Sequence, residues 1–412
     1  MKVLVLNSGS SSQKSALYEI GNAPPSAPPA PLWRAEIEWA RDAAHLYIQT
    51  SSGAVLDEKV SATDREAAVE RMLLMLWKGK TAVLQNTGQI DVVGHRVVHG
   101  GHKLNDVVFV TPEVKRVIAS VAAFAPLHNR AELEGIEIIE RMLGAIKQVA
   151  VFDTGFHRTL PLSAAVYPGP YEWFQQGIRR YGFHGINHQY CAERAAQLLG
   201  RELASLKMVS CHLGNGCSLA AIAGGRSMDT TMGFTPLDGL MMGTRSGSLD
   251  PGILTYLLRQ TSVTGDELDD ILNRKSGLLG ISGISSDMRE VLAAVREGDG
   301  RARLAFEIFV HRLQQAIASM ASSLGGLDVL SFSAGIGEHS QEVRAAACEK
   351  LGFLGIQLDP HNNISAVADQ EISAKDSKVK VLIIRAQEDW AIAKMCARLC
   401  EPGQKPQRGR ES

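Results

Sequence analysis

The sequence has no excess of charge of either sign, since 43 Lys and Arg face 44 Asp and Glu for a net charge of −1. A chain without a positive field does not attract nucleic acid or an anionic membrane surface, so neither is an expected partner. No apolar run approaches the roughly 18 residues that a bilayer crossing needs. The first apolar run, Val3 to Leu6, is too short for a signal peptide. These absences predict a cytoplasmic protein.

Cysteine is also scarce, with 6 in 412 residues and no CxxC pair. A disulfide framework is therefore not expected in a chain of this size. No Cys and His residues recur at the spacing of a zinc site. The chain has no GxxxxGK[ST] loop and no GxSxG turn. These absences argue against a Walker A nucleotide site and against a serine hydrolase.

The chain is long, and predicted strands and helices alternate along it. With 412 residues, 45% of them hydrophobic, it is long enough for two domains or one large two-lobed fold. Predicted strands, among them 33–39 and 44–50, alternate with predicted helices, the longest over 286–324, so the class is α/β. A strand, a polar glycine turn and a second strand occur at 3–20 and again at 208–223, which suggests an internal duplication. Five prolines predict a surface loop at 22–32.

Three glycine-rich turns could bind phosphate. They are Asn7 to Lys14, Cys211 to Ser218 and Phe332 to His339. Glycine allows a ligand to approach the backbone, while hydroxyl and amide groups donate to phosphate oxygens. Asn-Gly is also the commonest hairpin dipeptide, and a strand-to-helix turn explains the third segment equally well. The turns alone leave both interpretations open.

Charged residues inside glycine-rich, apolar surroundings are more informative. Arg96 lies in a predicted buried strand, and Arg245 lies between two glycines. A buried arginine needs an anionic partner, which is either a protein carboxylate or an anionic substrate, and the sequence leaves both open. Asp153 follows a strand at its carboxyl end, where α/β folds place functional groups. His184 stands between two glycines and has either a structural or a functional role.

Taken together, these segments resemble the acetate kinase family. The matching motifs follow the family's order from residue 3 to about 395: LNSGSSSQK, GHRVVHGG, APLHN, FDTGFH, YGFHG, CHLGNGCSL, MDTTMGFTPLDGLMMGTRSGSLDPG, SSDMR and FSAGIGEHS. The resemblance implies a two-lobed fold like that of sugar kinases, actin and the Hsp70 ATPase domain, with ATP in the cleft. It implies an N-terminal lobe of residues 1–155 plus 389–412 on the acceptor side. A nucleotide-binding, dimerising lobe would comprise residues 156–388.

The resemblance also implies roles for individual residues, with ATP or ADP and Mg²⁺ as cofactors and Mn²⁺ as a substitute metal. The implied magnesium ligands are Asn7 and Glu388. The implied catalytic residues are Asp153, Arg96, Arg245 and His184. The residues implied to bind the nucleotide and its phosphates are Ser10, Ser12, Lys14, His212, Gly214, Asn215, Gly216, Asp287, Arg289, Gly335 and Ile336. Acetate is implied to bind to Arg96, with its methyl group in an apolar pocket formed by Val98, Leu127, Phe183 and Pro236.

The implied activity is reversible phosphoryl transfer from ATP to acetate, giving acetyl phosphate and ADP, in a homodimer. Positioning and charge stabilisation dominate such a reaction, and acetate, already an anion, needs no strong base. Asp153 is thus expected to organise the arginines or the metal. A propionate or other short-chain acyl kinase is the alternative, because one methylene is worth only about 1–3 kcal/mol in a pocket. An actin- or Hsp70-like ATPase module would keep the phosphate loops without needing Arg96, Arg245 and His184.

Two positions near the implied site depart from the family pattern. Ile186 and Asn187 replace the usual Thr-Ser after the glycine that follows His184. Arg385, Ala386 and Gln387 replace the usual Pro-Thr-Asn before Glu388. The support behind His184 and the surroundings of Glu388 are therefore expected to differ from those of typical members.

Overall fold

The computed structural model describes residues 1–9, 12–21, 25, 27–39, 43–61, 64–121 and 126–401, with only the backbone for 126–130. The chain forms two compact units, Met1–Phe156 together with the segment that begins at Gln387, and His157–Ala386. Within the described residues no helix combines the length and apolar character needed to cross a membrane. The predicted loop at 22–32 and the C-terminal segment 402–412 fall partly or wholly outside this description.

The first unit contains an eight-stranded sheet in the order β5-β4-β3-β2-β1-β6-β8-β7. Its strands are β1 (Lys2–Ser8), β2 (Ser12–Glu19), β3 (Trp33–Trp39), β4 (Ala44–Thr50), β5 (Val55–Val60), β6 (Val92–Val97), β7 (Val108–Phe109) and β8 (Lys147–Phe152). Strands β1 to β5 form an antiparallel meander, whereas β1, β6 and β8 run parallel. Because parallel strands end at the same edge of a sheet, Asn7, Arg96 and Asp153 are brought to one edge.

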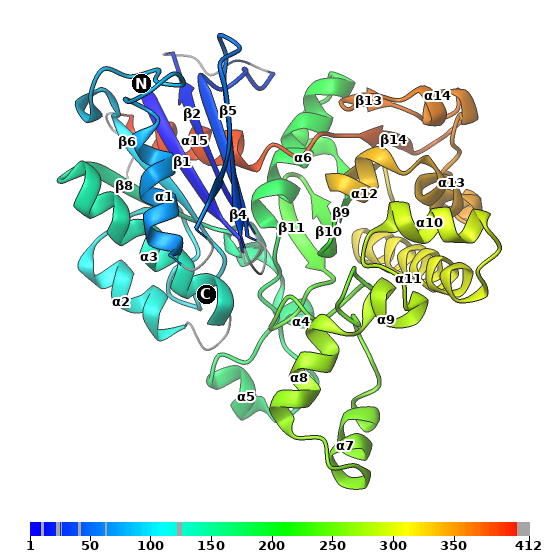
Figure 1. The fold of residues 1–412 in the computed structure, drawn as a ribbon. Helices are drawn as coiled ribbons and strands as arrows, with labels where there is room; N and C mark the ends of the chain where they lie inside the picture. The colour runs from blue at the N-terminus through cyan, green and yellow to red at the C-terminus, as the bar shows by residue number, and fades with distance from the viewer. Residues whose placement is uncertain are drawn as a thin grey trace. The chain divides into compact units, whose positions relative to one another are not determined.

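Helices cover both faces of this sheet (Figure 1). The helices of this unit are α1 (Arg65–Leu74), α2 (Pro112–Ser120), α3 (Pro126–Leu143) and α15 (Glu388–Cys400), and η1 (Thr87–Gln89) is a short 3₁₀ turn. Leu4 and Leu6 share a core cluster with Ile138 and Ile139 of α3. On the opposite face, Tyr18 of β2 packs against Trp390 of α15, with ring centroids 5.4 Å apart. The sheet is therefore buried between α15 and the α1–α3 layer.

Gly94 in β6 allows α15 to lie close to the sheet. A Cβ atom at this position would lie 2.6 Å from Cys396 Sγ and 2.9 Å from Ile392 Cγ2. Such contacts are far below van der Waals distance, so any larger residue would push the helix away. The glycine thus fixes the helix whose first residue is Glu388.

The second unit contains a six-stranded sheet in the order β11-β10-β9-β12-β14-β13. Its strands are β9 (Lys207–Leu213), β10 (Cys217–Ala223), β11 (Arg226–Thr230), β12 (Val329–Ser333), β13 (Gln370–Glu371) and β14 (Lys380–Ile383). Strands β9 and β10 form a hairpin, and β9, β12 and β14 run parallel. The first unit has the same order, with a β1–β2 hairpin followed by parallel β6 and β8. This repetition confirms the predicted α/β fold with a duplicated sheet core.

Helices and short 3₁₀ turns surround the second sheet. The turns are η3 (Gly155–Thr159), η4 (Leu203–Ser205) and η5 (Gly352–Leu354), and the shorter helices are α4 (Leu162–Ala165), α5 (Tyr171–Gln175), α9 (Gly277–Ser282), α12 (Ala334–His339) and α14 (Pro360–Ser365). The longer helices are α6 (Gly185–Leu199), α7 (Pro251–Gln260), α8 (Gly265–Arg274), α10 (Met288–Arg296), α11 (Gly300–Leu324) and α13 (Gln341–Glu349). The helix predicted over 286–324 is thus two helices. Gly298 has a φ of 93° and the Asp299 side chain caps α11, so the chain turns between them.

Candidate active site

The strand edge of the first unit holds a cluster of polar side chains around Arg96. Arg96 Nη2 lies 3.0 Å from Asp153 Oδ2, and Arg96 Nε lies 3.9 Å from Glu388 Oε2. The amide nitrogen of Asn7 donates to Asp389 Oδ1 at 3.0 Å and to Glu388 Oε2 at 3.4 Å. The structure therefore brings together Asn7, Arg96, Asp153 and Glu388, all predicted site residues.

Carboxylates outnumber cations in this cluster. Burial raises the pKa of Glu132 to about 8, although Arg96 and the Val98 amide counteract it. Burial also raises the pKa of Asp389, against the amide of Asn7, which lowers it. Burial opposes the charge of Arg96, but the attraction of Asp153, Glu388 and Glu132 outweighs it, so the pKa of Arg96 lies above its usual value. Several carboxyl groups buried around one guanidinium are short of positive charge, so a further cation bound beside them would favour their ionised forms.

The chemistry of these donors fits magnesium. Mg²⁺ prefers oxygen ligands and usually takes only one or two from protein carboxylates, with phosphates and water completing its shell. Asn7 and Glu388 offer amide and carboxylate oxygens, and Asp389 adds a carboxylate beside them. In the described part of the chain no group of three or more His, Cys, Asp or Glu residues is arranged to hold a metal by itself. A shared protein–phosphate site is therefore the form of binding that suits these residues.

The first glycine-rich turn is tight, since the Gly9 amide donates to the Ser12 carbonyl at 2.7 Å. Lys14 is half-exposed, and its Nζ lies 3.4 Å from Glu36 Oε1. Ser10 lies outside the described residues. In the predicted methyl pocket, Val98 is buried and its amide donates to Glu132 Oε2 at 3.0 Å. The Leu127 side chain lies outside the description.

In the second unit, two histidine rings are stacked at the end of the sheet. The rings of His184 and His212 are nearly parallel, with centroids 4.0 Å apart and planes at 16°. His184 Nδ1 lies 2.9 Å from Ser218 Oγ, and the same hydroxyl lies 2.8 Å from Nε2 of the buried His188. Asn187 Nδ2 donates to His212 Nδ1 at 2.9 Å. The residue that departs from the family pattern at 187 thus holds one ring of the stack.

Arg245 adjoins this stack at the second glycine-rich turn. A Cβ atom on Gly216 would lie 3.4 Å from His184 Cε1 and 3.5 Å from Arg245 Nη1. Arg245 Nη1 donates to the Pro236 carbonyl at 3.3 Å, and burial lowers its pKa. Among the described residues no carboxylate lies within 4.0 Å of Arg245, whereas Arg96 is paired with Asp153. The sequence left two kinds of partner open for each arginine, a protein carboxylate and an external anion. Arg96 has the carboxylate of Asp153, whereas Arg245 is suited to an external anion.

A cavity of about 550 Å³ collects most of the predicted nucleotide residues. It is lined by Gly214, Asn215, Ser286, Asp287, Met288, Arg289, Leu292, Gly335, Ile336, His339 and Ser340. This volume lies within the range of about 300–1,000 Å³ that is typical of small-molecule sites. Asp287 caps α10 and forms an ion pair with Arg289 at 2.5 Å. A Cβ atom on Gly335 would meet nothing within 4 Å, so the backbone there is accessible.

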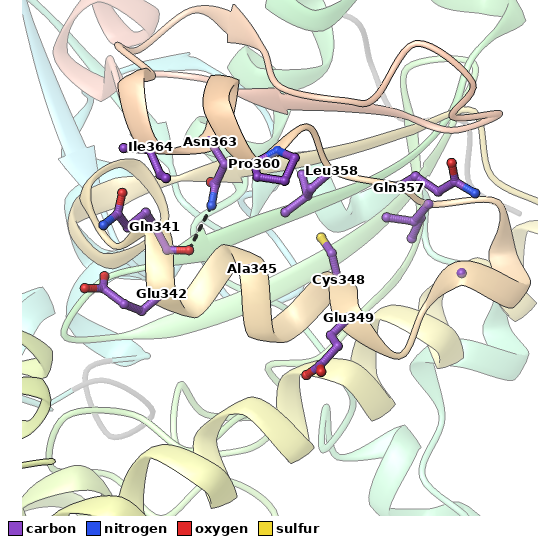
Figure 2. A pocket seen from close by; sticks show the side chains of 12 residues that line it. Gln341, Glu342, Ala345, Cys348, Glu349, Gln357, Leu358, Pro360, Asn363 and Ile364 are labelled. Atoms are coloured by element: carbon purple, nitrogen blue, oxygen red, sulfur yellow. Dashed lines mark hydrogen bonds between the residues drawn. The ribbon is translucent and has the colours of Figure 1, made fainter. Parts of the chain in front are cut away.

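A second cavity, of about 570 Å³, lies between α13 and α14 and contains none of the predicted residues (Figure 2). Polar groups on its wall already bind each other. Asn363 Nδ2 donates to the Gln341 carbonyl at 3.0 Å, and Asn363 Oδ1 accepts from Arg344 at 2.8 Å. The cavity therefore offers no comparable set of groups for phosphate.

Some neighbours of the site were missed by sequence reasoning. Asp389 stands next to a predicted metal ligand, which was a usable signal. Glu132 interrupts the buried stripe of α3 formed with Ile136 and Ile139, and a charge on such a stripe is also a detectable anomaly. Ser218 gave no such signal, because only the folded sheet brings its hydroxyl between two histidines.

Comparison with known proteins identifies the family of this chain. Residues 2–394 match the model of the acetokinase family. The chain is 56% identical over 403 residues to the acetate kinase of Cyanothece sp., covering 97% of this chain and 99% of that protein. It is 58% identical over 399 residues to the acetate kinase of Trichormus variabilis, covering 96% of this chain and 98% of that protein.

Solved structures give the same result. The acetate kinase of Porphyromonas gingivalis matches with a TM-score of 0.88 and 38% identity, covering 97% of this chain and 100% of the other. A propionate kinase from Francisella tularensis matches with a TM-score of 0.87 and 37% identity, covering 96% and 98%. With a family match over nearly its whole length and relatives more than half identical, the chain belongs to the acetokinase family.

Proposed function

We propose that this chain is an acetate kinase, which reversibly transfers the γ-phosphoryl group of ATP to acetate and gives acetyl phosphate and ADP. Membership of the acetokinase family makes it a phosphotransferase whose acceptor is a carboxyl group. The observation that carries the proposal is Arg245, a half-buried cation beside the His184–His212 stack with no carboxylate within 4.0 Å among the described residues.

The second unit is proposed to bind the nucleotide. Gly214 and Asn215, which precede Gly216 in the second glycine-rich turn, line the 550 Å³ cavity, while Gly335 and Ile336 line it from α12. Backbone amides at such glycine turns bind phosphate oxygens without side-chain interference. His212 and Gly216 would complete the phosphate contacts on this side. In the first unit, Ser10, Ser12 and Lys14 are proposed to form the other phosphate loop.

Charge stabilisation is proposed as the main catalytic effect. A phosphoryl group in transfer spreads negative charge over its equatorial oxygens, and fixed cations and hydrogen-bond donors stabilise it. Arg245 supplies a guanidinium that needs no rearrangement, because Pro236 already holds Nη1. Ser218 orients His184 through Nδ1, so Nε2 is the nitrogen proposed to donate to the phosphoryl oxygens.

The first unit is proposed to bind acetate and the metal. Arg96, held by Asp153, would bind the acetate carboxylate, and Val98 and Leu127 would contact the methyl group. Phe183 and Pro236 are the proposed methyl contacts of the second unit. We assign Mg²⁺, replaceable by Mn²⁺, to Asn7 and Glu388. When bound, the metal neutralises charge on the nucleotide phosphates.

Asp153 is proposed to organise Arg96 rather than to accept a proton. Its side chain is 1% exposed and forms a 3.0 Å ion pair with Arg96 Nη2. Acetate is already ionised, so no proton must leave it before attack. Near-normal turnover of Asp153→Asn would contradict the organising role. A loss that depends strongly on pH would instead favour proton transfer.

Two broader assignments follow from the family and are proposed with it, a homodimer and a cytoplasmic location. The exposed apolar side chains Ile253, Tyr256 and Leu258 of α7 support an association with a second copy. Association of this kind is expected where apolar side chains gather on a surface. The oligomeric state can be measured directly by light scattering of the purified protein.

The test is the formation of acyl phosphate, trapped with hydroxylamine, from ATP, Mg²⁺ and formate, acetate, propionate or butyrate. We expect turnover to peak with acetate and to collapse in Arg96→Ala and Arg245→Ala. A peak with propionate would retain the mechanism and make the chain a propionate kinase, like its Francisella tularensis relative. ATP hydrolysis without acyl phosphate from any acid would refute the proposal and favour an ATPase module.

A further inference from the structure

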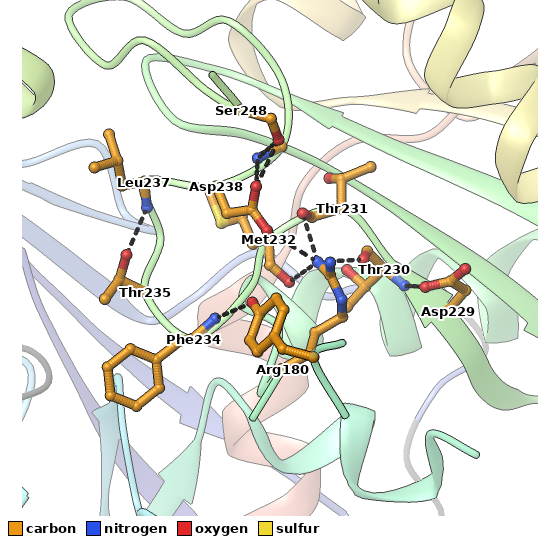
Figure 3. A network of polar contacts seen from close by, with 12 residues as sticks. Arg180, Asp229, Thr230, Thr231, Met232, Phe234, Thr235, Leu237, Asp238 and Ser248 are labelled. Atoms are coloured by element: carbon orange, nitrogen blue, oxygen red, sulfur yellow. Dashed lines mark hydrogen bonds and ion pairs between the residues drawn. The ribbon is translucent and has the colours of Figure 1, made fainter. Parts of the chain in front are cut away.

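Arg180 binds both ends of the loop that follows β11 (Figure 3). Its Nη1 donates to three successive carbonyl groups, those of Thr230 at 3.0 Å, Thr231 at 2.8 Å and Met232 at 3.0 Å. The same nitrogen lies 3.4 Å from Asp238 Oδ2. One guanidinium thus connects the start of the loop to its end.

The end of the loop is held independently of Arg180. Asp238 Oδ1 accepts from Ser248 Oγ at 2.5 Å and from the Gly239 amide at 2.9 Å. The Ser248 amide in turn donates to the Gly239 carbonyl at 2.9 Å. The Asp238 carboxylate is therefore held by contacts that do not involve Arg180. Its ion pair with Arg180 can thus fix the position of the loop.

The middle of the loop is attached to the segment that carries His184. The Tyr167 hydroxyl accepts from the Phe234 amide at 2.8 Å. The Gly233 carbonyl accepts from the Tyr181 amide at 3.0 Å. A Cβ atom on Gly233 would lie 2.1 Å from the Tyr167 hydroxyl oxygen and 2.5 Å from Asp238 Oδ2. These contacts leave the loop little room to move while Arg180 and Tyr167 are in place.

The loop carries a residue of the proposed acceptor site. Pro236 lies between the two points that Arg180 holds, and its carbonyl accepts from Arg245 Nη1 at 3.3 Å. Any displacement of the loop would therefore move an apolar wall and also alter the position of a catalytic cation.

We infer that Arg180 is a positioning residue that sets the length of the carboxylic acid this enzyme accepts, by holding Pro236 and Arg245 in register through the Thr230–Asp238 loop. The inference rests on the proposed function. Lysine cannot replace this arginine, because all four contacts are made by Nη1, and the Nζ atom of lysine is one bond closer to the backbone and would not reach the carbonyls and the carboxylate together. A loosened loop would admit the extra methylene of propionate and weaken the hold on acetate.

The experiment measures kcat and KM for acetate and for propionate, and KM for ATP, in the wild type, Arg180→Lys and Asp238→Asn. Arg201→Lys, which alters a half-exposed pair with Asp328 in the same unit, is the matched control. We expect Arg180→Lys to raise KM for acetate about tenfold and to lower the acetate-to-propionate ratio of kcat/KM by at least about threefold. KM for ATP should stay within about twofold of the wild type.

Asp238→Asn releases only one end of the loop, so it keeps the test available if Arg180→Lys does not fold. It should lower the same ratio to a smaller extent. Folded variants with the wild-type ratio, or equal losses with acetate, propionate and ATP, would overturn the inference and leave the proposed function standing. A wild type that makes no acyl phosphate from either acid would instead overturn the proposed function.

Discussion

Replacing Glu132 by glutamine should change how the stability of the protein depends on pH. Glu132 is 1% exposed, and its Oε2 accepts from the Val98 amide at 3.0 Å. Burial raises its pKa from 4.5 to about 8. Between these values the folded protein retains a proton that the unfolded chain releases. The contribution of Glu132 to the free energy of unfolding should therefore fall as the pH rises through this window.

The magnitude follows from proton linkage. Each pH unit between the two pKa values removes about 1.4 kcal/mol of stability. Over the roughly 3.5 units that separate them, the total is on the order of 5 kcal/mol. Glutamine keeps the size of the side chain and an oxygen that can accept from the Val98 amide, but it has no proton to lose. Glu132→Gln should thus resemble the wild type near pH 5 and gain on it steadily up to pH 8.

The assay is urea unfolding followed by tryptophan fluorescence at several pH values from 5 to 8.5. Glu137→Gln, on the exposed side of the same helix, is the matched control and should follow the wild type throughout. The quantity of interest is the difference in unfolding free energy between each variant and the wild type. If that difference for Glu132→Gln stays constant across the pH range, the carboxyl group is not held protonated and the reasoning fails.

Three further predictions concern other parts of the site. Gly243→Ala should raise KM for ATP at least about tenfold in steady-state kinetics, because its Cβ would lie 2.1 Å from Asn215 Oδ1; an unchanged KM would exclude that clash. Ser218→Ala should lower kcat about tenfold with little effect on KM for ATP, since it removes the hydroxyl that orients His184; an unaffected kcat would show that the ring needs no such support. His95 is buried with its pKa lowered to about 4, so its own contribution to the free energy of unfolding should fall by about 1.4 kcal/mol per unit as the pH falls from 6.5 toward 4. His95→Gln should flatten that acid limb in urea unfolding, and an identical slope would contradict the assignment.

Local patterns were enough to predict much of the fold. The strands predicted at 33–39 and 44–50 match β3 and β4, because alternating burial gives a strand an unambiguous signal. The segment 286–324 was predicted as one helix, since both of its parts have helical periodicity. The break at Gly298 and Asp299 depends on a positive φ and a capping side chain, which weigh little against the surrounding pattern.

The site was predictable where single residues stood in unusual surroundings or matched a family motif. Arg245 and Asp287 stood out by their surroundings or by the family resemblance, and the structure places them at the second glycine turn and its neighbouring cavity. The hold of Arg180 on three carbonyls was not predictable, because it joins strands and loops separated by about 50 residues. Interactions of that kind depend on tertiary packing and leave no trace in local composition.

The packing of α15 on the first sheet has a consequence for synthesis on the ribosome. Strands β1, β6 and β8 emerge early, yet the helix that covers one face of them is translated only after the whole of His157–Ala386. Until then Tyr18 lacks Trp390, and the space beside Gly94 lacks Cys396. The second unit can fold while the face of the first sheet that α15 covers is still exposed. The unit translated first should therefore be the last to acquire its native core, and a nascent chain stalled before Gln387 should depend on chaperones.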